Sequence, residues 1–330
     1  MNPNDVIAVL VTFNRSALLL ECLSALKIQS CSVSKVVIVN NSSTDATIES
    51  LITHGYIDRD YINNSVARSF KTKNRNYNYL ISVKRIVNID YIYVEIDVNS
   101  GGAGGFYLGQ SVALEYGSEW IWMMDDDGRP ASNCLEILLN AALSNNLMVL
   151  NPLVINVDDL EALSFGLSGK IKTVNDAVRY QNSSGLIEEK ANPFNGTLIN
   201  KSILLSNGLV KSEMFIWGDE AEYFLRLKKE GVSYATVVAA KFFHPQSKTI
   251  FKKAFFGLMK VSLKPETLEM NSYRNLGFIN KNYKSKSSHR VLIKLCVYFL
   301  INRQWAKVPV VFKYYMDGVR DTFKLPHFLR

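Results

Sequence analysis

The sequence predicts an α/β fold with a mostly parallel central sheet and helices on both faces. The first half of the chain alternates short apolar runs with segments of helical periodicity, which is typical of parallel sheets. Val6–Phe13 is apolar throughout, as expected of a strand covered on both faces. Ser16–Ile28 follows with leucines at helical spacing. Ligands of such sheets bind at the carboxyl ends of the strands.

The other elements follow from the same patterns. Residues 58–88, rich in Asn, Tyr, Lys and Arg, are expected to form an irregular insertion, and glycines punctuate short strands from about 151 to 200. Gly231 is expected to end a helix, and Ser132 to cap another. The predicted strands are Lys35–Asn40, Tyr91–Ile96, Trp120–Met124 and Val232–Phe243, and the predicted helices are Thr44–Ile52, Gly104–Tyr116, Cys134–Leu143 and Asp219–Glu230.

Charge divides the chain into two regions. Residues 251–330 hold 16 Lys and Arg against four acidic residues, whereas residues 1–250 hold 22 against 26. With 48% hydrophobic and 21% charged residues, the composition is ordinary for a globular protein with a sizeable core. The N-terminus lacks a signal-like cleavage site. The spacing of the cysteines predicts neither a metal site nor a disulfide framework. We therefore expect the protein to work in a reducing cytoplasm. The cysteines are Cys22, Cys31, Cys134 and Cys296.

Three carboxylates follow the most apolar strand, in Trp120-Ile-Trp-Met-Met-Asp-Asp-Asp127. Side chains alternate faces along a strand, so Asp125 and Asp127 are expected on one side and Asp126 on the other. Two carboxylates at a strand end form a site for Mg²⁺ or Mn²⁺ with the phosphates of a nucleotide. The alternative is a solvated acidic turn.

Other strand ends are polar too. Thr12-Phe13-Asn14-Arg15 and Asn40-Asn41-Ser-Ser-Thr-Asp45 end the first two predicted strands and could contact a nucleoside, although such residues are also common in turns and caps. Asn99-Ser-Gly-Gly-Ala-Gly-Gly105 opens a helix, where glycines and the helix N-terminus favour phosphate. It is neither a dinucleotide fingerprint nor a P-loop.

The second half adds three candidates. Asp219 and Glu220 begin a helix after Trp217, where acidic residues are also favoured by the helix dipole. A carboxylate here is a candidate general base. His244 ends a strand; it is either a surface histidine or a ligand that completes the metal site.

Taken together, these residues resemble the inverting family-two glycosyltransferases, in particular the bacterial galactofuranosyl- and rhamnosyltransferases of cell-surface polysaccharide synthesis. The family's motifs occur in order across residues 6–245. They are VTFNR, VNNSSTD, NSGGAGGF, WMMDDDGRP, NPFNGTLI, FIWGDEAEYFLRL and FFHP.

The resemblance implies a single nucleotide-sugar-binding domain of the GT-A type over 1–250, with a donor half 1–150 and an acceptor half 151–250. The basic helical region 251–330 follows it. The implied catalytic base is Glu220 or Asp219, with Glu220 favoured. The implied metal ligands for Mn²⁺ or Mg²⁺ are Asp125, Asp127 and His244, and the acceptor side is Trp217, Phe194 and Asn195. The implied donor-binding residues are Thr12, Asn14, Arg15, Asn41, Asp45, Asn99, Gly101, Gly102, Gly104, Gly105 and Asp126.

The implied reaction moves a sugar, galactofuranose first and rhamnose second, from a UDP- or dTDP-linked donor to a hydroxyl of a lipid-linked glycan, with inversion. The basic region is either a soluble helical subdomain or a surface for an anionic membrane at the cytoplasmic leaflet. No nucleic-acid module is recognisable, so no nucleic-acid partner is expected. The alternatives are a non-catalytic nucleotide-binding protein and a membrane-associated scaffold for polysaccharide assembly.

Overall fold

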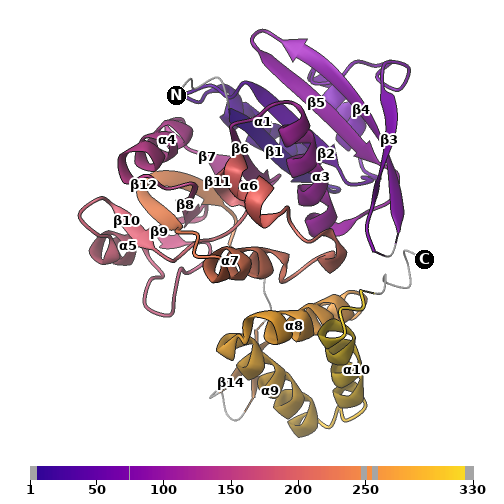
Figure 1. Cartoon of the computed structure of the whole chain (residues 1–330), viewed down its shortest axis with the longest axis vertical. Coiled ribbons are helices and arrows are strands. Elements are labelled where there is room, and N and C mark those ends of the chain that lie inside the picture. Colours follow the sequence, from indigo (N-terminus) through magenta and orange to yellow (C-terminus); the bar gives the residue numbers. More distant parts are fainter. Residues whose placement is uncertain (1–5, 74, 247–250, 255–258, 324–330) are drawn as a thin grey trace.

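One large mixed sheet lies between two layers of helices, with three further helices below it (Figure 1). The computed structural model describes residues 6–73, 75–246, 251–254 and 259–323. The strand order is β10-β12-β8-β11-β6-β1-β2-β5-β4-β3, with β7 beside β12 and β9 beside β8. The strands of this sheet are β1 (Val6–Thr12), β2 (Lys35–Asn40), β3 (Val66–Lys71), β4 (Asn76–Ile86), β5 (Ile89–Ile96), β6 (Trp120–Asp125), β7 (Arg129–Pro130), β8 (Val149–Asn156), β9 (Asp159–Leu163), β10 (Leu186–Glu188), β11 (Asn195–Asn200) and β12 (Ala235–His244).

A second, two-stranded sheet and the helices complete the described chain. The two strands are β13 (Phe251–Ala254) and β14 (Met259–Ser262). The helices are α1 (Ser16–Lys27), α2 (Thr47–Thr53), α3 (Gly101–Glu115), α4 (Cys134–Asn145), α5 (Val174–Tyr180), α6 (Lys201–Asn207), the 3-10 helix η2 (Ser212–Met214), α7 (Asp219–Lys229), α8 (Glu269–Tyr283), α9 (Lys286–Ile301) and α10 (Lys307–Val319).

The sheet is mixed, which corrects the expectation of a mostly parallel one. Strands β6, β1, β2 and β5 are parallel to their neighbours in this group, and β12 is parallel to β8. Between these groups β11 runs antiparallel to both β6 and β8. At the other edge, β4 runs antiparallel to β5 and to β3. The carboxyl ends of β1, β2, β5 and β6 still meet at one edge, because these four strands share a direction.

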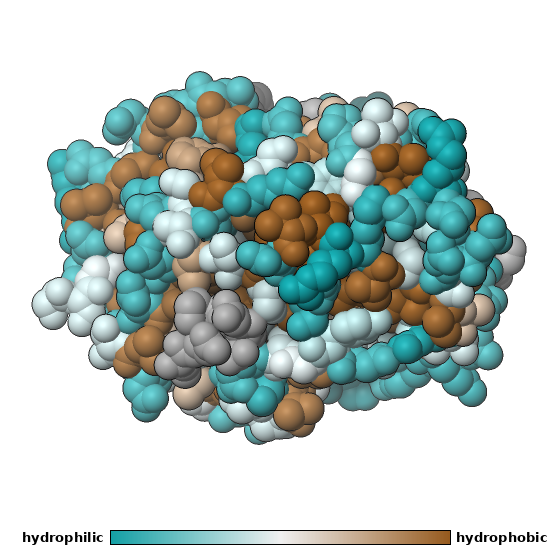
Figure 2. Space-filling view, turned by 90° about the horizontal axis from the view of Figure 1, so that it is seen from above, coloured by the Kyte–Doolittle hydropathy of each residue, from teal (hydrophilic) through white to brown (hydrophobic). Residues whose placement is uncertain are grey.

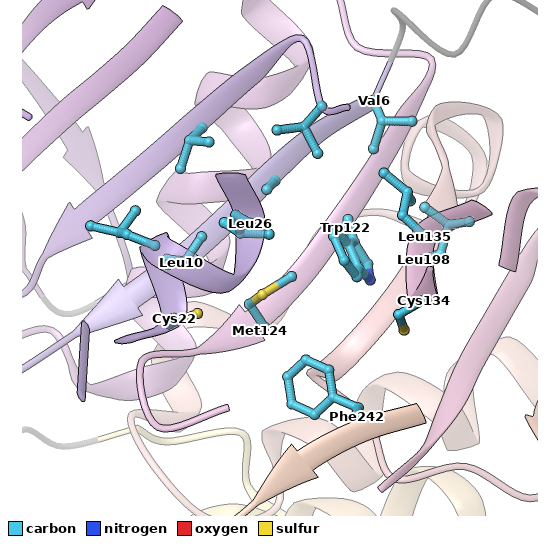
Figure 3. Packing of buried hydrophobic residues seen from close by; sticks show 14 of the residues in the cluster. Val6, Leu10, Cys22, Leu26, Trp122, Met124, Cys134, Leu135, Leu198 and Phe242 are labelled. Atoms are coloured by element: carbon cyan, nitrogen blue, oxygen red, sulfur yellow. The ribbon is translucent and has the colours of Figure 1, made fainter. Parts of the chain in front are cut away.

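The strand β1 is buried along its whole length because helices cover both faces of the sheet. Val6, Ala8 and Leu10 pack toward α1 and α4, whereas Ile7 and Val9 pack toward α3, α6 and α7. Figure 3 shows the first of these cores, in which Trp122 and Met124 of β6 lie beside Leu26 and Cys22 of α1 and Cys134 of α4. Each fully buried Leu, Val or Ile side chain stabilises the fold by about 1.5–3 kcal/mol relative to an exposed one.

Several predicted boundaries needed correction. Residues 58–88 contain β3 and all of β4 rather than an irregular insertion. Alternate tyrosines of β4, Tyr77 and Tyr79, are buried, whereas Asn76 and Asn78 are exposed, which is the period of a half-buried strand. The N-cap of α4 is Asn133, without a side-chain hydrogen bond, and not Ser132. The prediction for Gly231 is confirmed, since it follows α7 with a φ of 75°.

The last three helices are bound closely to one another and to the main body. A Cβ on Gly277 of α8 would lie 2.0 Å from the carbonyl oxygen of Tyr315, and one on Gly318 of α10 would lie 1.8 Å from that of Arg274. The two helices therefore touch backbone to backbone. On its other side α8 places Phe278 in the core that contains α7. None of the helices in the described ranges is both long enough and apolar enough to cross a membrane.

Candidate functional site

A cavity of about 440 Å³ opens where β1 and β6 end, between the N-termini of α3 and α7. It is the hollow at which the polar ends of β1, β2, β5 and β6 meet the acidic start of α7. Its walls are Val11, Thr12, Phe13, Arg15, Asn41, Asn99, Gly101, Gly102, Phe106, Asp125, Asp126, Phe215, Ile216, Trp217, Asp219, Glu220 and Leu268.

The acidic triplet is arranged differently from the strand alternation that the sequence suggested. The strand β6 ends at Asp125, and Asp126 and Asp127 lie in the turn that follows. Alternation of faces applies only inside a strand. As a result Asp125 and Asp126 line the cavity, whereas Asp127 is directed to His244 and Arg15.

Arg15 pairs with the carboxylates of both Asp126 and Asp127, and Thr12 donates a hydrogen bond to Asp126. Nη1 of Arg15 lies 3.0 Å from Oδ1 of Asp126 and 2.6 Å from Oδ2 of Asp127. The hydroxyl of Thr12 donates to Oδ2 of Asp126 at 2.8 Å. Burial raises the pKa of Asp126 despite this pairing. Asp125 has no such pair, and burial together with the charges of Asp127 and Asp126 raises its pKa to about 8.

His244 reaches the triplet from the end of β12. Its Nδ1 lies 2.6 Å from the carbonyl oxygen of Pro245, which can only accept, so Nδ1 carries a proton. Its Nε2 lies 2.9 Å from Oδ1 of Asp127. Burial by itself would lower the pKa of His244, but Asp127 outweighs it and the net shift is upward. The same contact, with Arg15, lowers the pKa of Asp127 against the opposing effect of burial.

The carboxylate and imidazole groups near the end of β6 are of the types that bind divalent cations. Carboxylate oxygens and an imidazole nitrogen are ligands that Mn²⁺ accepts, and the buried Oδ1 of Asp127 and Nε2 of His244 face each other at 2.9 Å. Within the described ranges, no group of three or more His, Cys, Asp or Glu side chains is arranged to surround a metal ion. Protein sites for Mg²⁺ often supply only one or two carboxylates and leave the rest of the shell to water and phosphate.

The glycine-rich segment is fixed by Asn41 at the end of β2. The side-chain amide of Asn41 donates to the carbonyl of Gly101 at 3.0 Å and to Oδ1 of Asn99 at 3.2 Å. Its oxygen accepts from the amide of Ser100 at 2.8 Å. Gly101, with a φ of 73°, starts α3, three residues earlier than predicted. Asn41 therefore shapes the cavity wall.

Some predicted donor residues serve the loops around the cavity instead of its wall. Oδ1 of Asn14 accepts from the amides of Thr44 and Asp45. The carboxylate of Asp45 accepts from the amide of Ser16, at the start of α1. A Cβ on Gly104 would overlap Ser100, and one on Gly105 would overlap Val11, so these two glycines permit close packing. Asn14, Asp45, Gly104 and Gly105 are not among the residues that line the cavity.

The opposite wall is the loop before α7. Trp217 has a φ of 61° and Gly218 a φ of 107°, and both precede the two carboxylates of the helix start. Asp219 is buried, and burial raises its pKa, although the first amides of α7 oppose the shift. Glu220 is exposed and lines the cavity. Desolvation by the surrounding protein, with the charges of Asp219 and Asp125, raises its pKa well above the ordinary range.

Phe194 and Asn195 do not reach the cavity. Phe194 is buried and packs on Phe106 at a centroid distance of 4.7 Å and on Tyr223 at 6.0 Å. The amide of Asn195 donates to the carbonyl of Pro193. Both residues therefore support the wall from behind in this structure.

Sequence reasoning missed part of the wall. Phe215 and Ile216 lie inside the FIWG segment but were not singled out. Leu268 lines the cavity from the basic region, and Lys264 lies over the Trp217 ring at 4.7 Å from its centroid. No local pattern in the basic region marks these two residues, since only the tertiary packing brings them here.

Comparison with known proteins places this site in a family. No protein-family model matches the sequence. The chain is 34% identical over 214 residues to galactofuranosyltransferase GlfT1 of Mycolicibacterium smegmatis, and the match covers 62% of this chain and 71% of that protein. It is also 34% identical over 185 residues to GlfT1 of Mycobacterium tuberculosis, and that match covers 55% of this chain and 61% of the relative. Among solved structures, S. aureus TarS 1-349 matches with a TM-score of 0.48 and 14% identity, over 91% of this chain and 73% of that one.

The chain is a glycosyltransferase with an α/β sheet and a carboxylate-lined cavity at its strand ends. It belongs to the family of galactofuranosyltransferase GlfT1.

The raised pKa of Asp125 predicts that the ligand-free protein loses stability as the pH rises. The folded protein keeps a proton that the unfolded chain releases above about pH 4, so stability falls between about pH 4 and 8. Asp125→Asn removes this loss. We expect the variant to be more stable than the parent at pH 8 by about 1–3 kcal/mol, reduced by solvent in the cavity, and similar at pH 4. Urea denaturation without divalent cations measures this.

Asp158→Asn is the matched control, because it removes the same charge from an exposed turn. It should follow the parent at every pH. A parent that is equally stable at pH 5 and pH 8, or an Asp125→Asn protein that is weaker at pH 8, would contradict the account of the triplet.

Proposed function

We propose that this protein transfers galactofuranose from UDP-galactofuranose to a hydroxyl of a glycan acceptor, with inversion at the anomeric carbon. The observation that carries the proposal is the pairing of two charged walls across one cavity. Asp125, Asp126 and Arg15 lie on one side, and Trp217 and Glu220 lie on the other. The names of the relatives support the choice of sugar. dTDP-rhamnose is the competing donor.

Glu220 is the better candidate for the general base. Asp219 is buried at the start of α7, where the amides of Asp219 and Glu220 hydrogen-bond its carboxylate. Such a carboxylate stabilises the helix N-terminus. Glu220 is exposed on the cavity wall, and desolvation and neighbouring charges raise its pKa. A raised pKa makes its carboxylate a stronger base toward a hydroxyl proton.

The reaction that these walls support is a single displacement. The acceptor hydroxyl oxygen forms a bond to the anomeric carbon as the bond from that carbon to the diphosphate oxygen breaks. The hydroxyl proton passes to Glu220, and the electron pair leaves with UDP. Trp217 lines the cavity beside this base and offers an aromatic side chain for contact with a sugar ring. Because the acceptor hydroxyl attacks the anomeric carbon directly, this reaction requires no covalent intermediate on the protein.

We further propose Asp125, Asp127 and His244 as the residues that would hold Mn²⁺ or Mg²⁺. When bound, the ion supplies Lewis-acid neutralisation of the diphosphate. Arg15 contacts Asp127 through the same carboxylate group that faces His244. Nδ1 of His244 is oriented by Pro245, which leaves Nε2 as the nitrogen for coordination.

Substitution of Glu220 tests the assignment of the base. Glu220→Gln should lower kcat by roughly 10²–10⁴-fold because the proton acceptor is lost, while the affinity for UDP changes little. Asp219→Asn should lower kcat less. The measurement is transfer from UDP-galactofuranose with Mn²⁺, with UDP-galactopyranose, UDP-glucose and dTDP-rhamnose as alternative donors and EDTA as the metal-free arm.

Glu161→Gln, an exposed carboxamide variant, is the control and should retain parental turnover. Parental turnover by a folded Glu220→Gln protein would exclude the proposed mechanism. Turnover with dTDP-rhamnose alone would exclude the proposed donor.

We also propose that α9 and α10 rest on an anionic membrane at its cytoplasmic face, where a lipid-linked acceptor would be presented. Apolar side chains on these helices and their connection are exposed, namely Val291, Ile293, Leu300, Ile301, Trp305, Phe312 and Met316. Exposed cations lie among them at Arg290, Lys294, Arg303, Lys313 and Arg320. Basic amphipathic helices bind such membranes.

Figure 2 views the molecule from the end away from these helices, and apolar residues there are interspersed with hydrophilic ones.

Vesicle binding tests the membrane surface. The parent protein should co-sediment with vesicles that contain phosphatidylglycerol more than with pure phosphatidylcholine, and salt should weaken binding. The double variant Trp305→Ser, Phe312→Ser should bind about tenfold more weakly, because it removes buried apolar area. Leu205→Ser on α6, also exposed, should bind like the parent. Equal binding to both vesicles, or a parental double variant, would contradict the proposal.

A further inference from the structure

We propose that Arg274 and Asn275 of α8 are positioning residues that hold the loop 213–218 in the conformation in which Trp217 and Glu220 face the cavity. This inference rests on the proposed function for the role of Glu220. It makes the C-terminal helical region a working part of the active site, beyond any membrane contact.

The loop is strained and therefore needs support. Phe215 has φ 65° and ψ −66°, the values of a γ-turn, and the amide of Ile216 donates to the carbonyl of Met214 at 2.8 Å. Trp217 also has a positive φ. Non-glycine residues persist in such conformations only where their surroundings enforce them.

Asn275 supplies this enforcement through a single side-chain amide. Its Nδ2 lies 2.9 Å from the carbonyl oxygen of Met214, 3.1 Å from that of Ile216 and 2.8 Å from that of Trp217. The amide carries two hydrogens, so the three acceptors share them. Asn275 is 1% exposed, and water does not compete for these bonds.

Arg274 orients the amide and adds a second attachment. Its Nε donates to Oδ1 of Asn275 at 3.2 Å, which leaves Nδ2 directed at the loop. Its Nη2 donates to the carbonyl of Met214 at 2.9 Å and lies 3.3 Å from that of Glu213. Arg274 is 3% exposed, with its guanidinium 4.8 Å from the centroid of the Phe323 ring. A buried guanidinium is costly unless it is used in this way.

The loop is held from the other side by the start of α3. The carbonyl of Phe215 accepts from the amide of Ala103 at 3.1 Å. A Cβ on Gly101 would lie 2.1 Å from that carbonyl oxygen. The loop is thus clamped between the glycine-rich segment and α8, and α7 begins directly after it. A shift of α8 would move the catalytic carboxylate relative to the donor wall.

Asn275→Asp tests the inference, since it removes the donor with little change of volume. We expect a 10- to 100-fold fall in kcat, the scale of a small misplacement of a catalytic group, while the Kd for UDP stays within about twofold. Hydrogen exchange should rise in residues 213–220 and remain parental in β1 and β6. Asn275→Ser keeps one donor, provides the test if the aspartate variant does not fold, and should show a smaller fall in kcat.

The matched control is Asn282→Asp, on the same helix, because its amide donates only to the Phe278 carbonyl within α8. It should leave kcat and exchange parental. The inference is overturned if the folded Asn275 variants keep parental kcat and loop exchange. It is also overturned if exchange rises uniformly while kcat and UDP affinity fall together. A parent without sugar transfer would instead refute the proposed function, and the exchange of residues 213–220 would still test the clamp.

Discussion

The end of β6 concentrates three carboxylates, and the arrangement of the site depends on how their charge is compensated. Thr12, the last residue of β1, and Arg15, just before α1, pair with Asp126, and Arg15 also pairs with Asp127. His244 approaches Asp127 from β12. Asp125 is left without a cation, and its carboxyl favours the protonated form up to about pH 8. A diphosphate would meet this edge only with added positive charge, so donor binding and cation binding are expected to be coupled.

A second constraint comes from the far wall of the cavity. In the proposed mechanism Glu220 reaches an acceptor only while the loop 213–218 keeps its shape, and that loop is attached to α8 through Asn275. The helix α8 is in turn packed backbone to backbone on α10 through Gly277 and Gly318. The helices proposed to rest on a membrane and the loop before the proposed base are therefore joined by one continuous set of packed helices.

Much of this arrangement could be predicted from the sequence. Local patterns located β1, β2, β6, α1 and α7 because each has clear apolar periodicity and polar ends. The orientation of Asp126 could not be predicted, since the strand ends at Asp125, two residues earlier than the alternation argument assumed. Short strands were expected between about 151 and 200, but the place of β11 between β6 and β8, antiparallel to both, could not be predicted because it depends on tertiary packing. Arg274 and Asn275 were invisible for the same reason, as their carbonyl partners lie about 60 residues away.

The most direct test of the account is calorimetric titration of UDP into the protein with Mn²⁺ and with EDTA. The account predicts that Mn²⁺ tightens UDP binding by at least about tenfold and that Asp125→Asn and Asp127→Asn each remove most of this gain. Equal UDP affinity in Mn²⁺ and in EDTA, or an unchanged gain in both variants, would contradict the claim that the carboxylate edge binds the donor diphosphate through a cation.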